Sequence, residues 1–417
     1  MTDTLPKTKV LFVSWMSVHD NVSHAGGKTL NYYLSRFSES PGFEIRLCIA
    51  GPRHSNDLAQ MVKQLSGKIH IYHETIPVVA AAIRKLYYKY KLNYYLCYLN
   101  AKFAHLDFVS LRYFSKLLNS KAFDSWSPDL VVLEWPEMLC LYEKVHTKYP
   151  YAKVIISEVD VAFQRYSRRI SARPIAKSLT TSIYRNLKQF ELQEIAKVDH
   201  VVVQSLKDKK LLVCEGVKEN KIFNLVPYYS KYFKTDYTNT KDILFWGAMS
   251  RPENIEAALW FIENVFSVLS KTKPDLRFIV LGGGEKSVLA SIGKHKGVIA
   301  TGFVLDPSSY FNDCCCLVAP LVHGAGIKVK VIEGMAAGLP VLTGEVGIEG
   351  INAFHKKHYF HCETADDYIS TIDLILSSPA VGEAIGKNSR QLIEQIFSYE
   401  SSFFEYRKLL STMHESA

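Results

Sequence analysis

The 417-residue sequence lacks the segments that would place it in a membrane or send it out of the cell. No apolar run reaches the roughly 18 residues that a membrane-spanning helix needs. Residues 1–15 pass from polar residues into a short predicted strand, without the apolar core and cleavage site of a secretory signal peptide. We therefore expect a chain that folds and stays in the cytoplasm.

Paired cysteine motifs are also absent. The eight cysteines include no C-x-x-C pair, so the common metal and redox motifs of that type are missing. Cys314, Cys315 and Cys316 are consecutive in a predicted strand, where neighbouring side chains point to opposite faces and cannot gather around one metal ion. We expect these cysteines in the core, because free cysteine is often buried. We predict no metal site and no cofactor.

Two nucleotide-binding motifs are present only in part. HAGGKT (24–29) ends like a Walker A motif, but Val22 stands where that motif needs a glycine. LGGGEKS (281–287) is similar to a dinucleotide fingerprint, but Ser287 replaces its last glycine. The sequence therefore predicts neither a P-loop hydrolase nor NAD binding.

The first of these segments still predicts a Gly26-Gly27 turn between a strand and the next helix. Such a turn lets a ligand approach the backbone and points helix N–H groups at an anion. A simple tight turn explains the same two glycines without a ligand.

Positive charge is distributed unevenly along the chain, whose net charge is +9. Residues 81–126 hold eight Lys/Arg, two acidic residues and seven tyrosines, and residues 163–188 hold seven Lys/Arg and no acid. A basic face interleaved with aromatic residues fits an anionic membrane surface or a phosphorylated acceptor. A solvated helix over a large core explains it equally well. Nucleic acid is not a predicted partner, because no recognition module is present.

Short β-rich runs alternate with helical patterns, which is typical of βαβ units around parallel sheets. Residues 226–242 are polar and lack periodicity, and after them the alternation restarts. We predict an N-terminal Rossmann-like domain at 1–228, with a C-terminal helix at 398–417 packing back on it, and a second Rossmann-like domain at 229–397. Two such sheets facing each other would form a ligand cleft between the carboxyl ends of their strands. The predicted strands are 9–15, 43–51, 128–135, 152–159 and 199–205 in the first half, and DILFWG, LRFIVLGGG, GVIATGF, CCLVAPL and LPVLTG in the second.

The segment VHGAGIKVKVIEGMAAGLP (322–340) predicts an anion-binding site. A strand runs into Gly324-Ala325-Gly326, and a helix follows that Gly338 ends. The glycines leave room for a phosphate at the positive end of that helix, where N–H groups and the dipole act together. Lys328 adds a full charge in the first turn.

Charged residues within this nearly apolar helix need a reason. For Lys330 we favour an i,i+3 surface pair with Glu333, which stabilises a helix only slightly. For Lys328 and Glu333 we favour a ligand, since a carboxylate at position 333 can accept hydrogen bonds from a diol such as a ribose.

At this point the sequence resembles a known family. FWGAMSRPENIEAALWF, RFIVLGGG, VIATGFVLD and VAPLVHGAGIKVKVIEGMAAGLPVLTGEVGIEG resemble the C-terminal domain of family 4 retaining glycosyltransferases with the GT-B fold, an α/β architecture of two Rossmann-like domains facing across a cleft. The resemblance is specific over residues 242–351 and looser over the rest.

The resemblance implies metal-independent transfer of a sugar, with retention, from a nucleotide-diphosphate donor, most simply a UDP or GDP sugar. The acceptor would be a glycan or glycolipid of the bacterial cell envelope or exopolysaccharide. It implies Glu333 on the donor ribose, Gly26 and Gly27 near the diphosphate, and Gly302, Phe303 and Val304 near the base. The full set of donor-binding residues predicted is Gly26, Gly27, Gly247, Arg251, Gly302, Phe303, Val304, Gly324, Ala325, Gly326, Ile327, Lys328 and Glu333. The predicted catalytic residues are Lys328, Glu158 and Asp160.

The sequence departs from the family pattern at three places. Ala325 stands at the first position of the usual E-x7-E pair, whose second member is Glu333. Ala248 and Asn254 replace the usual Arg and Lys after the first strand of the second domain, and Arg251 lies between them. The histidine expected after strand 152–159 is missing, and Glu158 and Asp160 stand there instead.

Two other functions fit the same sequence. A nucleotide-sugar epimerase of this fold would act on the donor alone. A catalytically silent nucleotide-sugar-binding scaffold is compatible with the missing Arg/Lys pair.

Overall fold

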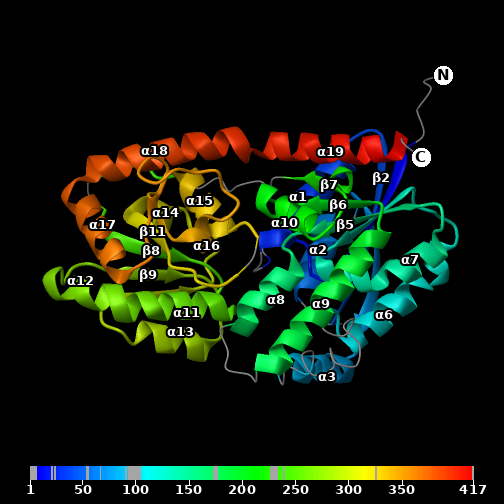
Figure 1. Cartoon of the computed structure of the whole chain (residues 1–417), viewed down its shortest axis with the longest axis horizontal. Coiled ribbons are helices and arrows are strands. Elements are labelled where there is room, and N and C mark those ends of the chain that lie inside the picture. The colour runs from blue at the N-terminus through cyan, green and yellow to red at the C-terminus, as the bar shows by residue number, and fades with distance from the viewer. Residues whose placement is uncertain are drawn as a thin grey trace. The chain divides into compact units, whose positions relative to one another are not determined.

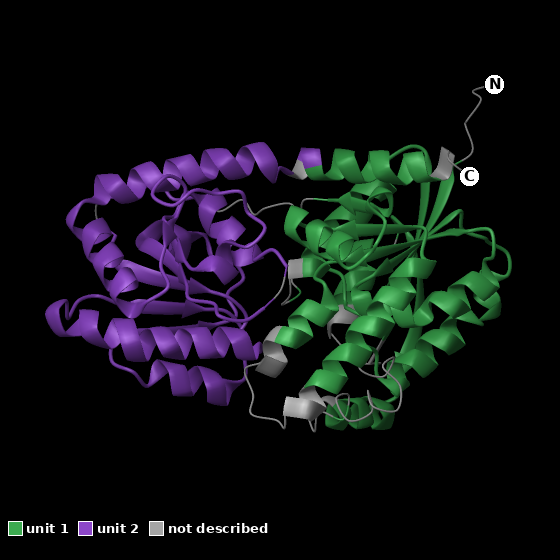
Figure 2. Ribbon diagram, viewed as in Figure 1, with its two compact units in different colours: residues 1–225, 402–417 green, residues 226–401 purple. Residues whose placement is uncertain are grey.

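A computed structural model describes residues 7–19, 22, 25–52, 56–65, 67–89, 92, 105–171, 177–225, 233–237, 240–324 and 326–415. Contacts divide the chain into two compact units, one of residues 1–225 with 402–417 and one of residues 226–401 (Figure 2). The sequence places this boundary between residues 228 and 229, and the contacts place it after Leu225. Among the described residues, no helix is both long and apolar enough to span a bilayer.

The first unit is built on a seven-stranded parallel sheet in the order β3-β2-β1-β4-β5-β6-β7. Strands β2, β5, β6 and β7 of this sheet are labelled in Figure 1. Its strands are β1 (Thr8–Ser14), β2 (Phe43–Pro52), β3 (His70–Ile76), β4 (Leu130–Glu134), β5 (Lys153–Glu158), β6 (His200–Val203) and β7 (Ile222–Asn224). Its helices include α1 (Ala25–Ser38), α2 (Asn56–Leu65), α3 (Val78–Lys89), α6 (Phe108–Leu118), α7 (Tyr142–Lys148), α8 (Ala162–Ser171), α9 (Lys177–Lys197) and α10 (Leu206–Cys214), with short 3₁₀ turns at Lys121–Phe123, Pro136–Leu141 and Glu219–Lys221.

The C-terminal helix α19 (Tyr399–Glu415) belongs to the core of the first unit from residue 402 onward. Its apolar residues Phe403, Tyr406 and Leu410 are buried against α1 and the first strands. The Tyr406 hydroxyl donates to Glu134 Oε1 at 3.4 Å, and Tyr33 and Ser402 share a hydrogen bond through their hydroxyls. The last helix of the sequence therefore completes the first domain, because α1 has an apolar face that this helix covers.

The second unit is built on a six-stranded parallel sheet in the order β10-β9-β8-β11-β12-β13. Its strands are β8 (Asp242–Trp246), β9 (Phe278–Leu281), β10 (Val298–Gly302), β11 (Cys314–Ala319), β12 (Val341–Thr343) and β13 (Phe360–His361). Its helices are α11 (Pro252–Phe261), a π-helical segment at Ile262–Phe266, α12 (Ser267–Thr272), α13 (Lys286–Gly293), α14 (Ser308–Asp313), α15 (Val329–Ala337), α16 (Glu345–Ile348), α17 (Ala365–Ser377) and α18 (Pro379–Ile396).

The middle of the second sheet is buried on both faces, which accounts for its apolar strands. Cys314, Cys315 and Cys316 lie in β11 and are buried, as their place in an apolar strand predicts. The segment before β8 is held to this unit, since Lys234 is buried and donates to the carbonyl oxygens of Asn312 and Cys314 at 2.7 Å each. Residues 233–237 are thus part of the second unit rather than a free linker.

Each strand predicted from the sequence is found within a few residues, and three further strands were not predicted. These are β3, β7 and β13, all of which lie at or beside a sheet edge. Strand β3 has the sequence HIYHETI, in which polar residues interrupt the apolar pattern and hide its strand character. Strands β7 and β13 have three and two residues, too few for a periodic pattern to show.

Candidate functional site

Three loops meet at the carboxyl edge of the second sheet, after β8, β9 and β10. The Gly247 N–H donates to the Leu281 carbonyl at 3.0 Å, and the Met249 N–H donates to the Gly283 carbonyl at 2.7 Å. A Cβ at Gly282 would lie 2.0 Å from the Gly247 carbonyl oxygen. The glycines that imitate a dinucleotide fingerprint are therefore required where these loops pack together.

The loop after β10 presents the residues that the resemblance assigns to the base. Gly302 has φ +73°, and its carbonyl oxygen accepts a hydrogen bond from the Gly282 N–H at 3.2 Å. Phe303 is 58 % exposed, whereas Val304 packs against the core of the unit. Phe303 thus offers an exposed aromatic ring at this edge of the sheet.

The glycine turn before α15 has the backbone that its residues require. Gly324 has φ +117° and Gly326 has φ +68°, both in the left-handed region that favours glycine. The helix begins at Val329 with Lys328 as its N-cap residue, and it ends at Gly338, whose φ of +80° confirms the predicted C-terminal glycine. Ile327 packs partly against the core. Ala325 lies outside the described residues.

Lys328 folds back over this turn instead of extending into solvent. Its Nζ donates to the Gly326 carbonyl oxygen and lies 3.5 Å from Glu349 Oε2. The two side chains are only 10 % and 8 % exposed. A positive charge is therefore held at the glycine turn by a carboxylate from the segment that follows α16.

Lys330 does not form the surface pair with Glu333 that the spacing favoured, and this prediction is wrong. Its Nζ donates to Asn254 Oδ1 and lies 5.1 Å from the centre of the Phe245 ring. Asn254 in turn donates through Nδ2 to the Ala248 carbonyl at 2.7 Å. Burial, together with the nearby charge of Arg251, lowers the pKa of Lys330 to about 7.

This contact gives a structural account of two departures from the family pattern. Asn254 and Ala248 occupy the positions of the usual Arg and Lys. Asn254 accepts a hydrogen bond from the ammonium of Lys330, and the Ala248 carbonyl oxygen holds the Asn254 side chain. A Cβ at Gly247 would lie 2.8 Å from Lys330 Nζ, so the glycine leaves room for that ammonium. The Arg251 side chain is 54 % exposed and lies 3.9 Å from Glu253 Oε1.

Glu333 lies in the second turn of α15 and is tied to the end of β8. Trp246, the last residue of β8, donates from its indole Nε1 to Glu333 Oε2. The Trp246 ring packs edge-on against Phe311 at a centroid distance of 5.6 Å. The carboxylate is thereby fixed beside the three loops and the glycine turn.

In the first unit, the predicted Gly26-Gly27 turn is wrong, because both glycines lie in the first turn of α1. The indole of Trp135 covers Gly26 so closely that a Cβ there would lie 1.8 Å from a ring atom. Trp135 follows β4 and has φ +87°, which is unusual for a residue other than glycine. Gly26 is thus needed for the packing of Trp135, and Gly27 is buried beside it.

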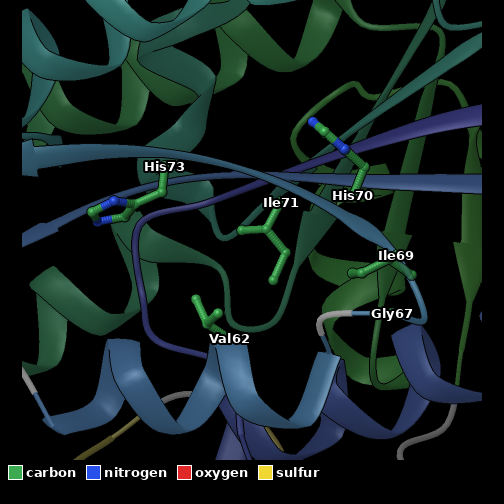
Figure 3. A pocket seen from close by; sticks show the side chains of 6 residues that line it. All are labelled: Val62, Gly67, Ile69, His70, Ile71 and His73. Carbon is green, nitrogen blue, oxygen red and sulfur yellow. The ribbon is translucent and has the colours of Figure 1, made fainter.

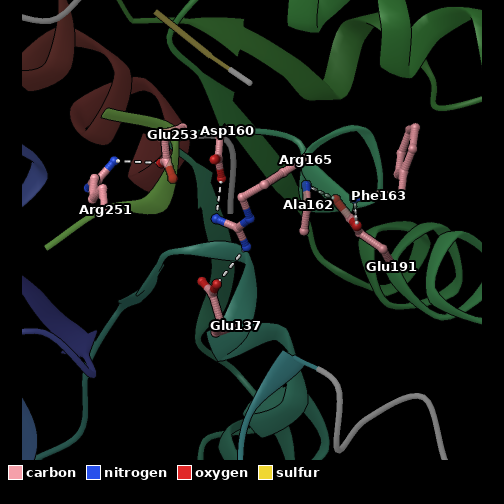
Figure 4. Close-up of polar contacts among 8 residues, drawn as sticks. All are labelled: Glu137, Asp160, Ala162, Phe163, Arg165, Glu191, Arg251 and Glu253. Atoms are coloured by element: carbon pink, nitrogen blue, oxygen red, sulfur yellow. Dashed lines mark hydrogen bonds and ion pairs between the residues drawn. The ribbon is translucent and has the colours of Figure 1, made fainter. Parts of the chain in front are cut away.

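Glu158 and Asp160 belong to an acidic cluster, which we define as Glu137, Glu158, Asp160 and Glu191 around Arg165. Figure 4 shows Glu137, Asp160, Arg165 and Glu191 of this cluster. Arg165 donates to Asp160 Oδ1 and to Glu137 Oε1, at 2.7 Å each. Glu191 accepts the N–H groups of Ala162 and Phe163, at 2.8 and 2.7 Å, and so caps the start of α8. Arg165 therefore lies inside the unit and not on the basic surface that residues 163–188 suggested.

The charges of this cluster do not balance. Glu158 is completely buried, and neither carboxylate oxygen has a hydrogen-bond partner among the described residues. Burial, and then the nearby Glu191, Asp160 and Glu137, raise the pKa of Glu158 well above its usual range. Burial also raises the pKa of Glu191 to about 8. Asp160, whose side chain is 19 % exposed, is the more accessible of the two predicted carboxylates.

A shallow pocket of about 350 Å³ lies elsewhere in the first unit, between α2 and the edge strand β3 (Figure 3). It is lined by Val62, Gly67, Ile69, His70, Ile71 and His73. These residues lie at the amino-terminal end of β3, whereas ligands of parallel α/β sheets bind at the carboxyl ends. None of the residues predicted from the sequence lines this pocket.

Several residues of the candidate site were not found from the sequence. Trp246 and Glu349 act through partners that are distant in sequence, and Arg165 is hidden in a run of surface-like cations. The apolar residues around Lys330 in its helix could have indicated that its side chain is buried. The spacing of Lys330 and Glu333 fits burial as well as a surface pair.

Comparisons with known proteins fit this geometry. Residues 240–378 match the family model described as glycosyl transferases group 1. A 191-residue stretch is 25% identical to an uncharacterized 44.6 kDa protein in the cps region of Klebsiella pneumoniae, and it covers 42% of this chain and 49% of that protein. The chain thus matches about half the length of this relative.

Solved structures are similar over nearly the whole chain. Sucrose-phosphate synthase from Thermosynechococcus elongatus has a TM-score of 0.71 at 13% identity, covering 99% of this chain and 100% of that one. Anabaena Alr3699/HepE in complex with UDP and glucose has a TM-score of 0.66 at 11% identity, covering 97% and 99%. This likeness confirms the predicted GT-B fold of two Rossmann-like domains.

Proposed function

Because residues 240–378 match the family model of the group 1 glycosyltransferases, we propose that this chain moves a sugar from a nucleoside-diphosphate sugar to a hydroxyl acceptor, with retention at the anomeric carbon. The observation that carries the proposal is the glycine turn at Gly324 and Gly326, with the ammonium of Lys328 held over it at the start of α15. A helix N-terminus with a cation beside it is suited to bind a diphosphate.

We assign the donor to the carboxyl edge of the second sheet. The diphosphate binds at Gly324, Gly326 and Lys328, and Lys330 adds charge from the other side of Gly247. Glu333, oriented by Trp246, accepts hydrogen bonds from the ribose, and the loop of Gly302 and Phe303 contacts the base. A uracil base is favoured, since the similar Alr3699/HepE was solved with UDP.

In the proposed reaction, the bond between the anomeric carbon and the diphosphate oxygen breaks while the acceptor oxygen bonds to that carbon on the same face. The leaving diphosphate takes the acceptor's proton, so no side-chain base is needed. Lys328 and Lys330 stabilise the negative charge that develops on the leaving group, which is commonly the largest catalytic contribution. Since these ammonium groups supply the charge, we expect activity without a divalent metal ion.

We assign the acceptor to the first unit, at the carboxyl ends of β1, β4 and β5. Asp160 is positioned by Arg165 and is accessible enough to contact an acceptor hydroxyl. Glu158 lies beneath it, fully buried, so we propose that it shapes the site rather than contacting the acceptor. The similarity to a protein from a cps region favours a polysaccharide or glycolipid acceptor. We also propose that the protein associates with the membrane surface.

Product analysis tests this function. The purified protein is incubated with UDP- or GDP-sugars, with and without a lipid-linked or oligosaccharide acceptor, in EDTA. We expect acceptor-dependent release of the nucleoside diphosphate and an α-linked product from an α-linked donor. Conversion of the donor sugar without any acceptor would instead identify an epimerase, and binding without turnover would identify a scaffold.

A further inference from the structure

An exposed apolar face lies on α3, at the edge of the first unit. Val78 and Val79 are 72 % and 74 % exposed, and Ile83 and Leu86 are also exposed. Val79, Ile83 and Leu86 are spaced i, i+4, i+7, so they project from one side of the helix. The exposed Phe108 at the start of α6 extends this face, because its ring packs edge-on against Tyr87 of α3 at 5.9 Å.

These five residues, Val78, Val79, Ile83, Leu86 and Phe108, are called the docking face below. A contiguous apolar face on an otherwise soluble unit marks an interaction surface. All charged residues of the two helices that carry this face are Lys or Arg, since neither α3 nor α6 contains an acidic residue. Lys85 and Arg112 are exposed beside the docking face.

Among the described residues, two nearby acidic residues pair with Arg84 and Lys116, and not with Lys85 or Arg112. Asp107 is fully buried and serves as the N-cap of α6, where it also pairs with Arg84 at 3.3 Å. Glu74, at the end of β3, pairs with Lys116. Apolar side chains flanked by cations are the pattern of a helix that lies in the interface of an anionic bilayer.

A short connection joins the docking face to the carboxyl edge of the first sheet. Helix α3 begins two residues after β3 ends, and β3 runs parallel to β2 and β1. The half-buried Arg84 guanidinium lies 3.3 Å from Asp107 Oδ2 and 5.6 Å from the centre of the Trp15 ring. Trp15 directly follows β1. The face and the proposed acceptor residues therefore share one edge of the same unit.

We propose that the docking face inserts into the surface of an anionic phospholipid bilayer and thereby presents a lipid-linked acceptor to the carboxyl edge of the first sheet. The second half of this statement rests on the proposed function, whereas the docking does not. Hydrophobic insertion supplies binding to the interface, and Lys85 and Arg112 supply preference for negative headgroups.

Vesicle flotation of the full chain tests the docking without any nucleotide sugar. The vesicles are phosphatidylcholine alone or phosphatidylcholine with phosphatidylglycerol, at low and high salt. We expect binding to anionic vesicles that weakens at high salt, with V79D/I83D and K85E/R112E each losing roughly tenfold or more in partitioning. V79S/I83S, a milder change, is expected to show a smaller loss with an unchanged thermal transition.

Two exposed apolar residues of the second unit provide a matched control. Val268 on α12 and Leu374 on α17 are 44 % and 43 % exposed, close to Ile83 at 43 %. V268D/L374D should leave vesicle binding unchanged. Absence of binding to anionic vesicles, an equal loss in V268D/L374D, or self-association that V79D/I83D abolishes without any vesicle binding would each overturn the docking.

The same variants separate the docking from the proposed function. Transfer to a short soluble acceptor should be unchanged in V79D/I83D, while transfer to a lipid-linked acceptor in vesicles should fall roughly in proportion to the lost binding. If the wild-type chain binds vesicles but transfers no sugar to any acceptor, the proposed function fails and the docking stands. If V79D/I83D and the wild type transfer sugar equally well to the lipid-linked acceptor in vesicles, the docking face does not present that acceptor to the enzyme.

Discussion

Lys328 Nζ lies 3.5 Å from Glu349 Oε2, and both side chains are about nine-tenths buried. Glu349 directly follows the short helix α16, whereas Lys328 begins α15 from the glycine turn. The pair therefore ties two loops at the carboxyl edge of the second sheet. It also fixes the one lysine that the sequence assigns to the diphosphate before any ligand arrives.

Breaking this pair should cost stability. Glu349→Gln leaves the ammonium of Lys328 buried without its counter-charge, and we expect the free energy of unfolding to fall by about 2 kcal/mol. The exposed pair of Glu383 with Lys387 is the control, since Glu383→Gln should change it by less than about 0.5 kcal/mol. Urea denaturation of both variants measures the difference. If both variants change the free energy of unfolding equally, the buried pair of Lys328 and Glu349 stabilises the fold no more than an exposed pair does.

Lys330 should make donor binding depend on pH. Its pKa is lowered to about 7, so the side chain loses its charge as the pH rises above neutrality. A bound diphosphate favours the charged form, and we expect UDP affinity to fall roughly tenfold between pH 7 and 9. Lys330→Met should bind weakly at both pH values and show little of this fall. Calorimetric titration at several pH values measures it. The same pH dependence in the variant would remove Lys330 from the site.

Gly26 should tolerate no side chain, because Trp135 occupies its space. Gly26→Ala places a Cβ 1.8 Å from the indole, and we expect destabilisation of about 2 kcal/mol with a shift in tryptophan fluorescence. Gly293 in α13 is the control, since a Cβ there would meet its nearest atom at 3.8 Å. Gly293→Ala should be neutral or stabilising by about 0.5 kcal/mol. A fully stable Gly26→Ala protein would contradict the packing described for Trp135.

Glu158 should destabilise the first unit as the pH rises. Its pKa is raised in the folded state by burial and by neighbouring carboxylates, so the unfolded chain releases this proton at lower pH than the folded chain. Stability is therefore lost as the pH rises above the ordinary glutamate range. Glu158→Gln should be more stable than the wild type by about 1–3 kcal/mol at pH 8, with a smaller difference near pH 4. Thermal unfolding across this pH range is the measurement.

Glu137→Gln is the matched control for this prediction. Glu137 accepts a hydrogen bond from Arg165 at 2.7 Å, so its loss should destabilise the unit instead. A Glu158→Gln protein that is also less stable at pH 8 would show that the carboxylate of Glu158 is ionised and stabilising.

The sequence predicts the architecture well because each central strand is a short apolar run bounded by polar or glycine residues. β1, β4 and β11 are buried along almost their whole length. The edge strand β3 escapes the same reasoning, since polar residues interrupt its apolar pattern, whereas the edge strand β10 is predicted. The C-terminal helix was expected to return to the first domain, and the structure places Phe403 and Tyr406 in that core.

The candidate site is predictable only where its chemistry is local. Gly324, Gly326 and Gly338 can be read from the sequence, because each requires a backbone that glycine adopts readily. The partners of the charged residues cannot be read in this way. Glu349 meets Lys328, and Trp246 meets Glu333, only after several strands and helices have packed. Lys330 shows the limit most clearly, because its spacing fits a surface pair and its tertiary contact is with Asn254.

The central claim is that a nucleoside diphosphate binds at the glycine turn, with Lys328 on the phosphates and Glu333 on the ribose. Thermal-shift titration of the wild type, Lys328→Ala and Glu333→Ala with UDP, GDP, ADP, CMP and TDP tests it most directly. We expect one nucleoside diphosphate, most simply UDP, to stabilise the wild type, and both variants to lose most of that shift. Undiminished stabilisation of both variants, or no stabilisation of the wild type by any of these nucleotides, would contradict the claim.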